Sequence, residues 1–224
     1  MLILAQIAQD TVAVTPASQE LSLLTLVMKG GVVMIPIIIL WIIATYIFIE
    51  RYLYIRQKTK RQKDFLDNII RMIKSGDVRG ATHYADKDET STGRILLAGL
   101  QYIGKPIKEI ETMMESVANI EVGEMEKHTS NLGIIAGIAP MLGFIGTISG
   151  IINIFYSISL TDNISIGIIA GGLYEKMVTS GSGLVVGLCA YTAYHLLNQM
   201  ISHFTLRVQR DSLEFIRYIV SPAE

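Results

Sequence analysis

The sequence predicts an all-α integral membrane protein with three transmembrane helices and long helices that extend into a cytoplasmic helical domain. The 224-residue chain is 50% hydrophobic and only 17% charged, whereas a soluble domain has about 25% charged residues. It also contains three long stretches with few or no charges, and the charged segment between the first two has helical periodicity. A net charge of −1 argues against nucleic acid as a partner, because binding to phosphates requires a basic surface.

The first transmembrane helix is expected at residues 30–54. Residues 30–49 carry no formal charge, and about 20 helical residues reach the roughly 30 Å of the hydrocarbon core. Residues 1–29 are expected to form an external N-terminal tail that includes an interfacial helix, because residues 21–28 are apolar but too short to cross.

The second transmembrane helix is expected at 129–158, within the uncharged run 129–161. A short external loop at 159–163 leads to the third transmembrane helix at 164–197, and a cytoplasmic C-terminal helix follows at 198–224. Residues 51–63 contain several bases and no acid, which marks this side of the membrane as cytoplasmic. The N-terminus is then outside and the C-terminus cytoplasmic.

Residues 55–128 are expected to form the cytoplasmic helical domain. Residues 75–77 should end one helix and cap the next, and residues 86–93 form a polar loop. Its last helix should begin at Pro106, a residue favoured in a first helical turn. Because no obvious stop signal precedes Pro140, we expect this helix to continue unbroken into the membrane.

Glu175 is the candidate ion carrier. It lies about 11 residues into the third span, or roughly 16 Å below the outer surface. A carboxyl group near the middle of a bilayer is costly and usually functional, and loss of solvent favours its protonated form. The alternative is an ion pair with Lys176 that only fixes helix packing. Adjacent helical residues do not face each other, so we expect Lys176 to meet an acid of another chain, and a Lys176→Ala variant separates the two cases.

Polar and small residues form stripes on the second and third spans. A helical wheel places Thr179 and Ser182 about 40° and 20° from Glu175, and Thr147 of the second span is expected to meet this stripe. Small residues three or four positions apart allow transmembrane helices to pack closely. The predicted packing positions are Pro140, Gly143, Gly146, Gly150, Gly183 and Gly187. Packing alone is the alternative explanation of both stripes.

Neither a metal nor an organic cofactor is expected, and we do not expect an enzyme. Cys189 is the only cysteine, so a cysteine-based metal site cannot form. The four histidines have no spacing typical of a metal site. A partial P-loop pattern at residues 99–105 is followed by Pro106, where Ser or Thr would be required to bind Mg²⁺.

Two segments carry a family resemblance. Residues 139–152, APMLGFIGTISGII, resemble the "AP-x-x-G-x-x-GT-x-x-G" signature of the MotA/TolQ/ExbB proton-channel family. Residues 169–184, IAGGLYEKMVTSGSGL, are similar to its "IA-x-G-I-x-EAL-x-x-T-x-x-GL" segment. Three spans favour the ExbB/TolQ branch, most of all ExbB, over the four-span MotA branch.

The resemblance implies roles for particular residues. The pore threonine falls on Thr147, the functional carboxylate on Glu175 and the threonine of the third span on Ser180. Two positions depart from the pattern, since Lys176 stands where the family usually has Ala, and Ser180 stands in place of Thr. Helical geometry favours the neighbouring Thr179 on the Glu175 face, so both hydroxyls remain candidates.

The resemblance also implies partners and a function. The chain would form a homopentamer around two copies of a single-span ExbD-like protein, in the inner membrane of a Gram-negative bacterium. This complex would use the proton-motive force to act on a TonB-like protein and energise outer-membrane transport. A TolQ-like role in envelope integrity and a passive membrane scaffold are the alternatives. Either H⁺ or Na⁺ could suit one carboxylate and several hydroxyls.

Overall fold

The computed structural model describes residues 31–60, 64–161 and 166–220, except the side chains of Thr161, Ile168 and Glu175. All regular structure in these ranges is helical, which confirms the predicted all-α class. The predicted N-terminal tail and interfacial helix lie outside the described residues. The predicted external loop at 159–163 is wrong for its first three residues, because residues 159–161 continue α8, and residues 162–163 lie outside the described part of the chain. The helices are α3 (Met34–Lys58), α4 (Phe65–Lys74), α5 (Val78–Asp86), α6 (Ser91–Gln101), α7 (Ile107–Glu126), α8 (Thr129–Thr161) and α9 (Ile166–Val220).

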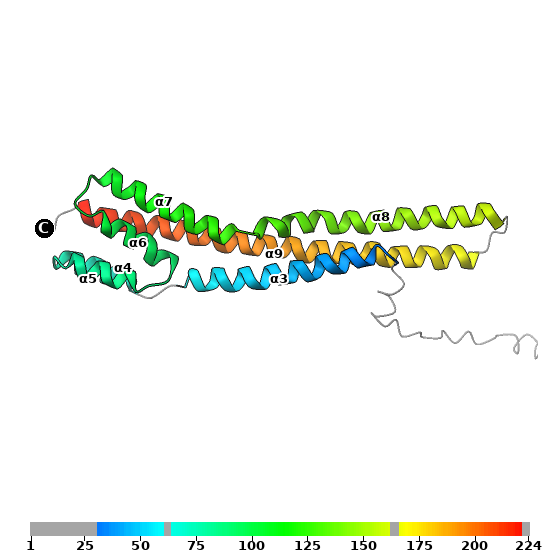
Figure 1. Ribbon diagram of the computed structural model, residues 1–224, viewed down its shortest axis with the longest axis horizontal. Coiled ribbons are helices and arrows are strands. Elements are labelled where there is room, and N and C mark those ends of the chain that lie inside the picture. The colour runs from blue at the N-terminus through cyan, green and yellow to red at the C-terminus, as the bar shows by residue number, and fades with distance from the viewer. Residues whose placement is uncertain (1–30, 61–63, 162–165, 221–224) are drawn as a thin grey trace, which may run out of the picture.

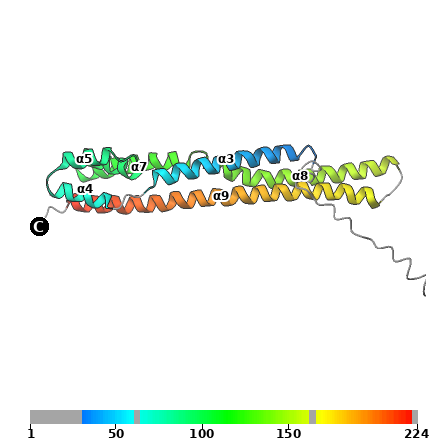
Figure 2. The same ribbon diagram turned by 90° about the horizontal axis from the view of Figure 1, so that it is seen from below.

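The helices form an elongated bundle (Figures 1 and 2). Helices α8 and α9 run antiparallel at one end of the bundle, and α3 packs beside them over part of their length. At the other end, the shorter helices α4 to α7 gather around the C-terminal half of α9. The 55 residues of α9 reach about 80 Å at 1.5 Å per residue, so this helix extends far beyond one membrane thickness.

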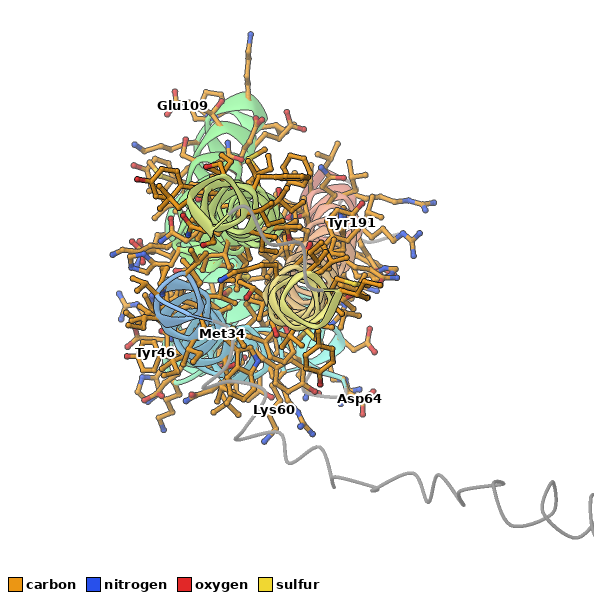
Figure 3. All side chains as sticks on the ribbon, turned by 90° about the vertical axis from the view of Figure 1, so that its right-hand side faces the viewer. Met34, Tyr46, Lys60, Asp64, Glu109 and Tyr191 are labelled. Atoms are coloured by element: carbon orange, nitrogen blue, oxygen red, sulfur yellow. The ribbon has the colours of Figure 1, made fainter. Side chains whose placement is uncertain are left out.

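Three helical stretches are long and apolar enough to cross a membrane, namely Met34–Lys58, Ile107–Leu160 and Ile169–Val220. The second of these stretches includes both α7 and α8. Viewed along the long axis, α3, α8 and α9 lie next to one another, with Tyr46 and Tyr191 on the outside (Figure 3). Both tyrosines are exposed, as are Trp41, Phe144 and many aliphatic side chains of the same helices. Exposed apolar surface of this extent is typical of helices that contact lipid or other membrane helices.

The predicted unbroken helix after Pro106 is wrong, because α7 ends at Glu126 and α8 begins at Thr129. Lys127 is extended, with ψ 129°, and His128 has a left-handed φ of 65°. Two side chains satisfy carbonyl groups at this break. Buried Arg51 of α3 donates from Nη1 to the Glu124 carbonyl oxygen at 3.0 Å, and the Thr129 hydroxyl donates to the Glu126 carbonyl oxygen. The break therefore depends partly on a contact from α3.

Other helix boundaries follow local capping. Asp77 accepts a hydrogen bond from the backbone N–H of Gly80 at 2.8 Å and caps α5, as predicted from residues 75–77. The predicted polar loop at 86–93 is shorter than expected. Helix α6 already begins at Ser91, because the Thr90 hydroxyl accepts from the Gly93 N–H at 3.2 Å and caps it.

The end of the bundle formed by α4 to α7 has an apolar core that contains the buried carboxylate of Glu121. Glu121 of α7 is only 6% exposed, and its two carboxylate oxygens accept hydrogen bonds from Ser91 at 2.6 Å and from Arg94 at 3.0 Å. The hydrogen bond from Glu121 raises the pKa of Arg94 above its ordinary value. The surrounding core is formed by large side chains of several helices, including Ile55, Ile69, Ile95, Leu96, Ile110, Met114, Phe204 and Phe215.

A Glu121→Ala substitution is expected to lower the free energy of unfolding by about 1–3 kcal/mol, because it leaves the buried Ser91 hydroxyl without its acceptor and Arg94 without its partner. Thermal unfolding in detergent measures this loss. Glu115→Ala is the matched control, since Glu115 is exposed on the same helix. Equal midpoints for the two variants would contradict the stabilising role of the α6–α7 contact.

Candidate functional site

Helices α8 and α9 contact each other through glycines. A Cβ atom built on Gly183 would lie 2.5 Å from the Ala139 carbonyl oxygen, and one on Gly187 would lie 2.5 Å from Cγ of Pro140. On α8, a Cβ atom on Gly143 would lie 3.0 Å from the Ser180 carbonyl oxygen. The two backbones thus approach too closely for larger side chains at these positions. The predicted packing residues Pro140, Gly143, Gly146, Gly150, Gly183 and Gly187 all lie in this contact.

Thr147 provides a polar connection between the two helices. Its Oγ1 lies 3.2 Å from the carbonyl oxygen of Gly143 on α8 and 3.2 Å from that of Lys176 on α9. A hydroxyl has one hydrogen to donate, so the two carbonyl groups share this donor. An intrahelical bond is common for a threonine in a membrane helix, but the second acceptor belongs to the helix that carries Glu175. The structure therefore brings Thr147 to the backbone of the predicted polar stripe.

The other predicted hydroxyls occupy different places on α9. Thr179 is fully buried, and its methyl group lies 2.9 Å from the position of a Cβ atom on Gly146. Ser180 faces Gly143 through its backbone, and its side chain and that of Ser182 are half-buried. Glu175 belongs to α9, but its side chain lies outside the described part of the chain. Of the two candidates Thr179 and Ser180, it is Thr179 whose side chain packs on α8.

Lys176 points across α8 toward the beginning of α3. Its Cγ, Cδ and Cε atoms occupy the space where a Cβ atom of Gly150 would lie. Its Nζ atom lies 3.5 Å from the position of a Cβ atom on Gly31. None of the salt bridges found among the described side chains includes Lys176. We did not predict Gly31 as a neighbour of this lysine, because the contact joins residues that lie far apart in the sequence.

A Thr147→Val substitution keeps the side-chain shape and removes the hydroxyl that bonds to the Lys176 carbonyl. Loss of one hydrogen bond is worth roughly 0.5–1.5 kcal/mol, so proton flux through reconstituted vesicles is expected to fall about three- to tenfold. Thr147→Ser keeps the donor and is the matched control, which should stay near the wild-type rate. Wild-type flux in the valine variant would show that the hydroxyl has no part in ion movement.

The fold and the site define a multi-pass helical membrane protein in which two spans form a glycine-packed hairpin with threonine side chains at their contact. The family model described as the MotA/TolQ/ExbB proton channel family matches residues 87–210. This range covers more than half of the chain and includes α8 and most of α9. The chain therefore belongs to the MotA/TolQ/ExbB proton channel family.

Several curated relatives have names from two branches of this family. The chain is 29% identical over 179 residues to a biopolymer transport protein named ExbB-like 1 of Synechocystis, covering 76% of this chain and 68% of that protein. It is 24% identical over 157 residues to the biopolymer transport protein ExbB of Pseudomonas putida, covering 66% and 48%. It is 26% identical over 110 residues to the Tol-Pal system protein TolQ of Haemophilus influenzae, covering 49% and 46%. These relatives indicate a subunit of the ExbB/TolQ type.

Proposed function

We propose that this chain is the proton-channel and stator subunit of an inner-membrane motor that uses the proton-motive force to energise TonB-dependent outer-membrane transport. One observation carries the site assignment. The Thr147 hydroxyl lies within hydrogen-bonding distance of the Lys176 carbonyl oxygen across the glycine-packed α8–α9 contact. This contact sits next to Glu175 in sequence, so the hydroxyl and the carboxyl belong to one region of the hairpin. The ExbB names of several relatives support the TonB-linked role.

In this proposal, Glu175 takes up a proton from one side of the membrane and releases it to the other. The hydroxyl groups of Thr147, Thr179, Ser180 and Ser182 line the route and hold water or pass protons by hydrogen bonds. Hydroxyls suit this work because each can both donate and accept. In this scheme the carboxyl group and the four hydroxyls come from this chain, and a second carboxylate comes from the partner protein.

The proposed assembly is a homopentamer that encloses an ExbD-like single-span protein with a membrane carboxylate, and that transmits force to a TonB-like protein. The proposed topology places the N-terminus in the periplasm and the C-terminus in the cytoplasm. The basic segment after the first span supports this orientation. The length of α9 supports transmission, because one continuous helix joins the membrane to the cytoplasmic core.

Purification of the full-length chain from its native membrane tests the assembly. We expect a small single-span protein with an acidic residue in its span to co-purify, and the complex to carry protons into vesicles when a membrane potential is applied. A pH-sensitive dye inside the vesicles reports the flux. Purification of the chain without any single-span protein, together with vesicles that carry no protons, would refute the proposed motor.

A TolQ-like role is the second candidate, because the TolQ protein of H. influenzae is among the relatives. Deletion of the gene distinguishes the two. A TonB-linked subunit predicts loss of energised uptake through the outer membrane with an intact envelope. A TolQ-like subunit predicts detergent sensitivity and leakage of periplasmic proteins with uptake preserved.

A further inference from the structure

Among the described side chains at 129–158 and 166–197, which form the two spans of the hairpin, Lys176 is the only charged one. Helix α8, on which it packs, contains no Asp, Glu, Lys or Arg. The lysine stem lies in the space that the absent side chain of Gly150 leaves open. The ammonium group extends past α8 to Gly31, just before α3 begins at Met34. Lys176 of α9 therefore packs on α8 and reaches the segment that precedes α3.

The stem fills space beside a group of oxygen atoms. The hydroxyl oxygen of Thr147 lies 3.2 Å from the carbonyl oxygen of Gly143 and 3.2 Å from that of Lys176. Gly150 is one helical turn from Thr147 on the same face of α8. A metal cation that passed here would find oxygen ligands, but it would need room for a shell of several ligands around it. The stem of Lys176 takes up that room.

A proton has no such requirement. A proton passes from one oxygen atom to the next along hydroxyls, water and a carboxyl group, so it needs hydrogen-bond partners but no coordination shell. The filled space next to Thr147 therefore distinguishes the two kinds of cation by volume. The positive charge of the ammonium opposes the entry of any second cation as well, so it adds to the barrier without selecting between them.

We infer that Lys176 determines the ion specificity of this chain, because its stem fills the space beside Gly150 and so excludes Na⁺ from a route that protons can use. The inference rests on the proposed function and deepens it, since it names the residue that keeps Na⁺ out of the proton route. It also gives Lys176 a place within its own subunit, where the sequence had suggested an acid of another chain.

Three variants distinguish the effect of the volume of the Lys176 side chain on Na⁺ entry from the effect of its charge. Lys176→Ala removes both the stem and the ammonium and opens the space beside Gly150. Lys176→Met removes the charge and keeps an unbranched stem of similar length. A double variant, Lys176→Ala with Gly150→Ala, returns a methyl group to the opened space. Lys108→Ala is the matched control, because Lys108 is exposed in the first turn of α7.

The experiment measures uptake of radioactive ²²Na⁺ and entry of protons in vesicles that contain the complex with its co-purified partner. We expect Na⁺ uptake at the background of empty vesicles for the wild type, Lys108→Ala and Lys176→Met. For Lys176→Ala we expect uptake at least tenfold above that background, and the added methyl group of the double variant should lower it by more than half.

Several results would overturn the inference. The first is uptake of Na⁺ by the wild type. The second is an assembled Lys176→Ala complex that excludes Na⁺ or carries no ion at all. The third is a Lys176→Met complex that carries Na⁺ as fast as Lys176→Ala. Undiminished Na⁺ uptake by the double variant would overturn it too. These outcomes differ from failure of the proposed function, in which the wild-type complex carries no protons at all.

Discussion

A Glu175→Gln variant is expected to lose proton-driven transport by at least a hundredfold while the complex stays assembled. Glutamine has nearly the shape of a protonated glutamic acid but cannot release a proton, so the route through the third span is blocked. The measurements are energised uptake in cells and dye-detected proton flux in vesicles. Size-exclusion chromatography of the purified complex reports assembly. Glu115→Gln on the exposed surface of α7 is the matched control and should behave as the wild type.

Full transport in the Glu175→Gln variant would favour the passive scaffold over the motor. A scaffold built from packed helices requires its glycines but tolerates a neutral residue at position 175. The outcome therefore decides between ion movement and packing as the reason for a carboxyl group in this span. Loss of both assembly and transport would instead assign Glu175 a structural role.

A Gly183→Val variant is expected to disrupt the α8–α9 hairpin. A Cβ atom at this position would lie 2.5 Å from the Ala139 carbonyl oxygen and 3.0 Å from Cα of Gly143. Both neighbours are backbone atoms of α8, so no side-chain rotation relieves the clash and the helices must separate. Overpacking of this kind costs about 1–3 kcal/mol, and backbone contacts place the cost at the upper end. A lower unfolding midpoint in detergent and a smaller yield of assembled complex measure it.

Gly181 offers the matched control, because it lies two residues away on the same helix and a Cβ atom there would meet nothing within 4 Å. Gly181→Val should keep the unfolding midpoint of the hairpin close to that of the wild type. A normal midpoint and yield for Gly183→Val would show that the close approach of the two helices is not needed for stability.

Charge and small-residue patterns predicted much of this fold. The uncharged run 129–161 coincides with α8, as expected from the rarity of charged side chains in helices that cross a membrane. The glycines of the second and third spans were identified from their spacing, and the structure places them at the α8–α9 contact. Both patterns can be identified in the sequence of a single helix, because each reflects which side chains fit in the immediate surroundings of that helix.

Features that depend on partners distant in sequence could not be predicted. The break at Lys127 and His128 contains no Gly or Pro, and one of its contacts comes from Arg51 on α3. The place of Lys176 likewise requires the antiparallel register of α8 and α9, which brings Gly150 opposite it. The sequence showed that a lysine in the membrane needs compensation, but it did not show which helix supplies the space.

The contrast between α9 and the α7–α8 pair has a mechanical consequence. Helix α9 is about 80 Å long and is continuous from its contact with α8 to the core around α4 to α7, whereas α7 and α8 meet at a break between residues 126 and 129. A tilt of only about 5° at one end of a helix of this length displaces the other end by roughly 7 Å. A small angular change near Glu175 would therefore produce a large displacement at the end of the bundle formed by α4 to α7, and the break between α7 and α8 would let α8 follow without bending.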